Sequence, residues 1–153
     1  MADIRIVKTK PEHLRELART IRKEDKREIE AFGYTANVAL WRSYKGSVIC
    51  KSIFVQNELA AIFGVGGETL DDAGKIWFLT TSAAEKVSPL RFARIYQEQV
   101  LKMLKTFKRL ENYVDYSYTS SIRILELVGF TVHDPEPMGE KGNLFCKYTM
   151  RMA

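Results

Sequence analysis

The stretch RLENYVDYSYTSSIRILELVGFTV, residues 109–132, constrains the fold more than any other part of the chain. The first half of this stretch contains aromatic and β-branched residues, which favour a half-buried strand: Tyr113, Val114, Tyr116 and Tyr118. Apolar residues then recur at helical spacing over 122–128. Ser120 or Ser121 is placed to cap that helix, and Gly129 is placed to end it in the left-handed conformation. The stretch therefore predicts a strand, a short capped helix and a second strand.

A unit of the same kind precedes it. Residues 76–81 predict an apolar strand, 82–87 a loop, and 89–107 a long amphipathic helix. Ser88 and Pro89 favour a helix start, because serine caps the first turn and proline is tolerated there. A strand–helix–strand crossover returns in parallel. Two neighbouring parallel strands, each followed by a helix N-terminus, form a cleft at their carboxyl ends that suits an anion.

The remaining segments predict a hairpin, further helices and a closing strand. Strands are predicted over 3–7, 47–55, 59–65, 110–118 and 144–150. Helices are predicted over 35–43 and from Thr9-Lys10-Pro11, with Thr9 as the cap, and an extended loop over 133–137. The glycine-rich run 64–67 predicts a bulge or hairpin, because a dinucleotide loop would need a helix directly after it. We expect one α/β (α+β) domain over residues 1–153, with a mixed, mostly antiparallel central sheet and helices on both faces.

Composition narrows the class of protein and of partner. The chain is 46% hydrophobic and 28% charged, which is ordinary for a globular protein, and its net charge of +5 favours anionic partners such as a phosphorylated cofactor, nucleic acid or an acidic protein surface. No apolar run approaches the ~20 residues of a membrane span, and the N-terminus does not fit a signal peptide. Cys50 and Cys146 are expected to be reduced thiols of a cytosolic protein. Because His13 and His133 lack metal-ligand spacing, we expect no metal site.

A dense run of charges follows the first predicted helix. The run IRKEDKREIEAFG, residues 21–33, has two interpretations. Runs of this kind usually form a solvated helix face. The functional alternative is that Glu24, Asp25 or Glu28 lines a substrate cleft.

Several of these segments resemble a known family. The strand followed by TSSIRILELVGF resembles the last cofactor-contacting segment of the GNAT (GCN5-related N-acetyltransferase) fold. More narrowly, IWFLTTS, LENYVD with SSIRILELVGFTV, and the turn at 135–139 resemble a phage-encoded GNAT-like family that includes the internal virion protein A of short-tailed phages. The resemblance runs over nearly the whole chain and is most specific over 110–142.

The resemblance implies a coenzyme site. In the wider family, acetyl-CoA enters between two splayed parallel strands, and the loop after the first strand binds the pyrophosphate through its N–H groups. By position, the cofactor-binding candidates in this chain are Leu79, Thr80, Thr81, Ser82, Lys86, Ser88, Arg91 and Ser121. The sequence departs from the family pattern because the loop 82–87 has no glycine and carries Glu85, and glycine is what lets a backbone approach phosphate closely.

A second departure concerns catalysis. Acyl transfer to an amine needs a base for the amine proton and often an acid for the leaving thiolate. The position of the family's acidic tyrosine holds Leu125, and the position of its asparagine holds Tyr118. The candidates that remain are Tyr116 or Tyr118 as the acid and, as the base, one of four carboxylates: Glu68, Asp115, Glu24 and Glu28.

Three functions fit these observations. The first is a phage-encoded GNAT-fold protein with a degenerate acetyl-CoA cleft, which acts in virion structure or assembly or on a host protein, in the host cytoplasm or the virion. The second is an active acetyl-CoA-dependent N-acetyltransferase that acetylates an amine of a protein or small molecule. The third is a nucleic-acid-binding accessory protein that uses the basic face of residues 89–109. The third is the weakest, because that face lacks interleaved aromatic residues.

Overall fold

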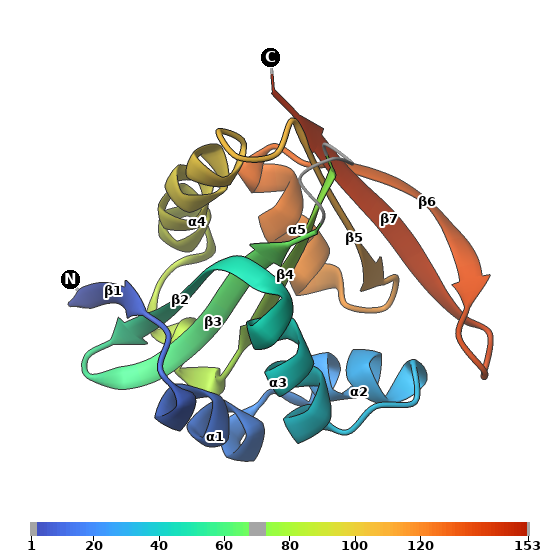
Figure 1. Cartoon of the computed structure of the whole chain (residues 1–153). Coiled ribbons are helices and arrows are strands. Elements are labelled where there is room, and N and C mark those ends of the chain that lie inside the picture. The colour runs from blue at the N-terminus through green and yellow to red at the C-terminus, as the bar shows by residue number, and fades with distance from the viewer. Residues whose placement is uncertain (1–2, 68–72, 153) are drawn as a thin grey trace.

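The computed structural model describes residues 3–67 and 73–152, which form a seven-stranded sheet with helices on both faces (Figure 1). The strands are β1 (Ile4–Lys8), β2 (Ser47–Val55), β3 (Glu58–Gly66), β4 (Ala73–Thr80), β5 (Arg109–Asp115), β6 (Thr131–Met138) and β7 (Asn143–Arg151). The helices are α1 (Pro11–Thr20), α2 (Lys23–Ala31), α3 (Ala36–Gly46), α4 (Pro89–Met103) and α5 (Thr119–Val128). The predicted fold class is confirmed.

The order of strands in the sheet is β1-β2-β3-β4-β5-β7-β6. Among the described residues, β4 and β5 pair in parallel and the other neighbours pair antiparallel. The parallel register begins at Ala73↔Arg109 and ends at Lys75↔Glu111. Just beyond it, the Asn112 side-chain amide donates to the Ile76 carbonyl oxygen. From that point β4 and β5 diverge and form the splayed pair of parallel strands that the fold class implies.

Two hydrophobic clusters hold the layers together. One packs α4 and α5 on the sheet through buried side chains that include Phe63, Tyr96, Val100, Leu110 and Val128. The other packs α1 and α3 on the opposite face through Leu14, Leu17, Leu40, Leu59 and Ile62. In Figure 1, α4 and α5 lie beside each other, and α1, α2 and α3 gather along the lower part of the sheet. Among the described residues, no helix has the length and hydrophobicity needed to cross a membrane.

Some of the predicted helix ends are confirmed. The Ser88 hydroxyl oxygen accepts from the Arg91 N–H at 3.2 Å, so serine caps α4 as predicted. Pro11 occupies the first turn of α1, and Thr35 caps α3. Gly129 ends α5 at φ = 115°, a left-handed conformation in which a side chain would be strained.

Two predicted caps and one predicted loop are wrong. The Thr9 hydroxyl bonds Ser52 at 2.9 Å instead of capping α1, whose N-cap is Lys10. Helix α5 begins at Thr119, before both serines, because the Asp115 carboxylate accepts from the N–H and hydroxyl of Ser117 and turns the chain early. The same turn ends β5 at residue 115 instead of 118. The expected loop 133–137 belongs to β6, which tolerates two prolines because it is an edge strand.

The glycine-rich run lies in β3 and opposite a bulge, as predicted. The β2–β3 register shifts between Ser47 and Ile49, so the strands approach unusually closely there. A Cβ atom on Gly66 would lie 2.1 Å from the Gly46 carbonyl oxygen, which is backbone and has no room to move aside. The glycine therefore serves this close approach, not a phosphate.

We expect Gly66→Ala to destabilise the fold by about 1–3 kcal/mol, because the new methyl group forces β2 away from β3. The measurement is the free energy of unfolding in urea. Gly46→Ala is the matched control: its Cβ has nothing within 4 Å, so it should change stability by less than about 0.5 kcal/mol. Equal effects of the two changes would contradict the close approach.

Candidate functional site

A cavity of about 560 Å³ opens where β4 and β5 diverge. Its floor is aromatic: the Phe78 ring lies 5.5 Å from the Phe92 ring and 4.5 Å from the Tyr96 ring, centroid to centroid. The N-terminal turn of α5 forms one wall, and Pro89, at the start of α4, also lines the cavity. Because the N-terminal turns of two helices border it, the cavity has the position predicted for an anion-binding cleft.

The structure brings some predicted site residues to this cavity. Thr80, Tyr118 and Ser121 line it. Tyr116 does not; its side chain is 50% exposed. Glu68 lies outside the described residues.

The other coenzyme candidates have different surroundings. Leu79 packs with the α1–α3 cluster on the opposite face of the sheet. The Thr81 hydroxyl donates to the Leu59 carbonyl oxygen at 2.6 Å, and its N–H donates to the Ala60 carbonyl oxygen at 2.9 Å. The Lys86 ammonium lies 2.9 Å from the Glu58 carboxylate. Ser82 is exposed, and Ser88 and Arg91 are bonded to each other in the α4 cap. The candidates that do not line the cavity are therefore Leu79, Thr81, Ser82, Lys86, Ser88 and Arg91.

The predicted phosphate-binding loop is a 3-10 helix, Ser82–Lys86. Three amide hydrogens at this segment are used within the chain: those of Ala83, Ala84 and Val87. The Ala83 N–H donates to the Thr81 hydroxyl at 3.2 Å, and the Ala84 N–H donates to the Thr81 carbonyl at 3.2 Å. The Val87 N–H donates to the Ala84 carbonyl at 3.3 Å. These amides are therefore not directed toward a ligand.

Two carboxylates of α2 occupy the splay. The Asp25 carboxylate accepts from the Thr80 N–H at 2.8 Å and from the Thr80 hydroxyl at 3.0 Å. The Glu28 carboxylate accepts from the Asp115 N–H at 2.7 Å. Residues three apart on a helix share one face, so α2 binds β4 through one carboxylate and β5 through the other.

Burial dominates the electrostatics of these groups. It raises the pKa of Asp25 to about 6, although the bonds from Thr80 and the nearby Arg22 guanidinium lower it. Burial also raises the pKa of Glu28 to about 8; the Asp115 N–H opposes this shift, and the negative charges of Asp25 and Asp115 add to it. Burial therefore favours the neutral form of both carboxyl groups, and it favours that of Glu28 more strongly.

Tyrosine and arginine side chains lie around the carboxyl groups of Asp25, Glu28 and Asp115. Burial, with the charge of Asp25, raises the pKa of Tyr118, and a hydrogen bond with the Thr80 side chain partly offsets the rise. Burial likewise raises the pKa of Tyr148. The Arg27 Nε atom lies 3.3 Å from the Asp115 Oδ2 atom, so the buried Asp115 carboxylate is ion-paired. Within the described ranges, no cluster of three or more metal-ligating side chains is present.

The sequence predicted part of this arrangement. Asp25 lines the cavity, as one interpretation of the charged run proposed, and Glu28 of the same helix accepts from the Asp115 N–H of β5. The aromatic floor was not predicted, although Phe92 and Tyr96 stand four residues apart on the apolar face of α4 and Phe78 projects from β4. Periodicity could have placed these rings in the core. It could not have shown that a cavity borders them.

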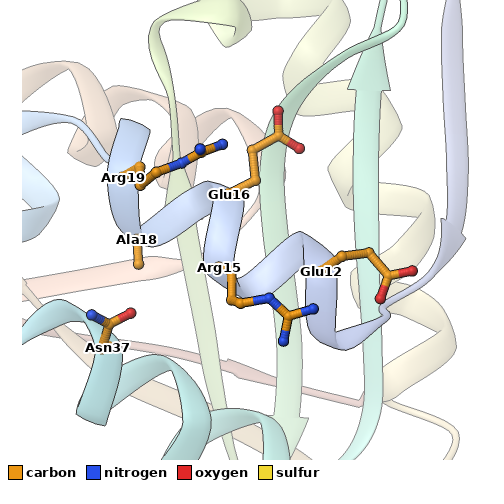
Figure 2. Close-up of a pocket in the computed structure, with 6 residues that line it drawn as sticks. All are labelled: Glu12, Arg15, Glu16, Ala18, Arg19 and Asn37. Atoms are coloured by element: carbon orange, nitrogen blue, oxygen red, sulfur yellow. The ribbon is translucent and has the colours of Figure 1, made fainter.

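A second hollow, of about 640 Å³, lies between α1 and α3 (Figure 2). Figure 2 shows charged side chains of α1 around it, with Asn37 of α3 on the other side. Its lining includes two arginines and two glutamates, and it includes none of Asp25, Glu28 and Asp115. It has mixed charge and no predicted site residue in its lining, so it has no role in the predicted chemistry.

Solved structures with the same fold are GNAT acetyltransferases. The acetyltransferase of the GNAT family from Streptococcus pneumoniae is 12% identical, with a TM-score of 0.66, and the match covers 99% of this chain and 100% of that chain. YncA from Salmonella typhimurium, solved with acetyl-CoA, is 9% identical with a TM-score of 0.70, over 98% and 94% of the two chains. RimL, a ribosomal L7/L12 alpha-N-protein acetyltransferase solved with coenzyme A, is 12% identical with a TM-score of 0.64, over 97% and 94%. At these identities the likeness shows the fold alone.

Sequence comparison supplies the family. Among curated proteins, none matches the chain. A family model described as "Bacteriophage T7, probable scaffold protein Gp13" matches residues 52–136, which is more than half of the 153 residues. The matched region begins in β2 and ends in β6, so it contains the diverging strands, the 3-10 helix, α4 and α5. The chain belongs to this bacteriophage T7 Gp13 family and has the fold of the GNAT acetyltransferases.

Proposed function

We propose that this chain is a phage protein of virion assembly whose acetyl-CoA cleft is degenerate and which acts by binding another protein of the virion or the host. One observation carries the proposal: several backbone amides at the splay and at the 3-10 helix are already hydrogen-bonded within the chain. Thr80 N–H is bound by Asp25, Asp115 N–H by Glu28, and the 3-10 helix binds its own amides. Membership of a phage scaffold family supports the same function.

The charges at the mouth of the cleft also disfavour a diphosphate. Lys86 is paired with Glu58, and Arg22 contacts both Glu24 at 3.7 Å and Glu85 at 3.5 Å. The Glu85 carboxylate is 65% exposed, so a diphosphate bound at this loop would meet a negative charge. Binding would have to break these pairs and desolvate the carboxylate, which lowers affinity.

The proposal predicts that acetyl-CoA does not stabilise the protein. A ligand present at 100 times its dissociation constant raises the free energy of unfolding by ~2.7 kcal/mol. We expect no change in Tm at millimolar acetyl-CoA, measured by differential scanning calorimetry. A saturable rise in Tm that desulfo-CoA also produces would contradict the degenerate cleft.

The assembly role predicts a defect in particles, not in acetylation. We expect a phage that lacks this gene to form fewer infectious particles, and the wild-type gene in trans to restore the titre. Ser121→Tyr places a ring in the cavity. It should restore the titre equally well, because the proposal puts the partner-binding surface outside the cavity. Failure of this variant, when its Tm shows that it folds, would mean that the cavity itself is needed.

One observation favours a second function, an N-acetyltransferase: the cavity is open and two groups in it suit acyl transfer. Burial keeps the Tyr118 hydroxyl protonated, so it is available to protonate a leaving thiolate. Asp25, with a pKa of about 6, is able to accept a proton from an amine near neutral pH.

This second function predicts a specific mutational pattern. Tyr118→Phe should lower the rate of coenzyme-A release with a protein or amine acceptor by at least about tenfold. Tyr116→Phe is the matched control, since Tyr116 lies outside the cavity lining. An equal effect of both changes, or no release by the wild-type protein, would contradict this function.

A further inference from the structure

Helix α2 is held to the sheet by carboxylates more than by apolar packing. Neither hydrophobic cluster contains a residue of this helix. Its buried residues are Asp25 and Ala31, and most of the sequence KEDKREIEA is charged. Beyond its C-terminus, the Phe32 ring packs against Phe145 at 5.1 Å but stays 42% exposed. Loss of the carboxylate bonds would therefore weaken the attachment of α2, which would keep the ion pair of Arg27 with Asp115 at 3.3 Å.

The two bonds replace the strand pairing that β4 and β5 give up. Successive amides of a strand point to opposite sides. Thr81 N–H donates to Ala60 on β3, so the Thr80 N–H points toward β5. Tyr116 N–H donates to Leu144 on β7, so the Asp115 N–H points toward β4. Asp25 and Glu28 thus cap the two inner strand edges, which face each other across the splay.

The neighbours of α2 are anchored independently of it. Leu14 and Leu17 hold α1, and Leu40 holds α3, in the second hydrophobic cluster. The Arg22 N–H donates to the Thr80 carbonyl at 3.1 Å before α2 begins, and Gly33, at φ = 82°, follows its end. The helix can therefore leave the splay while the helices on either side stay in place.

We propose that α2 is a proton-controlled latch. It closes the splay while the carboxyl groups of Asp25 and Glu28 are protonated, and it releases the inner edges of β4 and β5 when both groups ionise. The latch does not depend on the proposed function. It governs access to the two inner strand edges, whatever the function of the cavity.

Strand β4 meets Asp25 through the uncharged Thr80, and the other elements around these two carboxylates contribute titratable or charged groups. Asp115 of β5 adds a third carboxylate, paired with Arg27 of α2 itself at 3.3 Å. Arg22 and Glu24 flank Asp25 with opposite charges. Tyr118 at the start of α5 and Tyr148 of β7 face the group as neutral hydroxyls, because burial raises the pKa of both.

The direction of the pH dependence follows from the raised pKa values. In the closed form the pKa of Asp25 is about 6 and that of Glu28 about 8, above the ordinary values of both. The closed form therefore binds more protons than the open form. Closure is strongest below about pH 4 and weakens as the pH rises through 6 and then 8, by up to ~10-fold per pH unit for each group.

Amide hydrogen exchange followed by NMR tests the latch, because the Thr80 and Asp115 amides report its closure directly. Exchange rates would be divided by the intrinsic chemical rates at each pH. Between about pH 5 and pH 9, we expect protection of these two amides to fall by at least ~100-fold. Protection of the Phe63 amide, in the middle of the sheet, should stay constant.

Variants separate the latch from general loosening. Glu28→Gln keeps a neutral acceptor for the Asp115 N–H, so protection of this amide should persist at high pH. Glu30→Gln is the matched control on the same helix, since Glu30 is exposed and pairs with Lys26; it should leave the wild-type dependence unchanged. Asp25→Asn provides a second neutral variant if Glu28→Gln does not fold.

Two results would overturn the latch. One is pH-independent protection of Thr80 and Asp115 in the wild-type protein. The other is a fall in protection in both neutral variants that matches the wild type. Neither result bears on acetyl-CoA binding or on phage titre, so the latch and the proposed function succeed or fail separately.

Discussion

The early end of pairing between β4 and β5 is the constraint on which the rest of the structure depends. The two strands match over three residue pairs, from Ala73↔Arg109 to Lys75↔Glu111. Beyond them, each strand has backbone donors that its neighbour no longer satisfies. A buried donor without a partner costs about 1–3 kcal/mol, so the divergence requires replacement acceptors.

The chain supplies those acceptors from a helix on the face of the sheet opposite α4 and α5. Asp25 and Glu28 are hydrophilic side chains on a charged helix, yet they bind amides of the two inner strand edges. This solution satisfies the backbone but places three carboxylates near one another, with Arg27 and Arg22 nearby. Raised pKa values follow from that burial and repulsion, and they connect the shape of the cleft to proton binding.

The GNAT fold leaves the same space between its strands, and function depends on what occupies it. Family membership and the internally bonded amides support our proposal of an assembly protein that keeps the acyltransferase fold and fills part of the cleft with its own side chains. Fold alone does not distinguish these uses, because catalysis requires specific groups at the site. Leu125, which lines the cavity and has no ionisable side chain, and the glycine-free 3-10 helix are the specific features of this site.

The sequence by itself determined the local elements and much of their order. Ser88, Thr35 and Gly129 act within a few residues, so their roles can be derived from the chain alone. Tertiary structure decided the site, because Asp25 bonds a residue 55 positions away and Glu28 one 87 positions away. A charged run on a helix carries no signal of which distant amides it will meet. Closure of the sheet brings those amides within reach, and the burial that results changes the pKa values of the carboxylates.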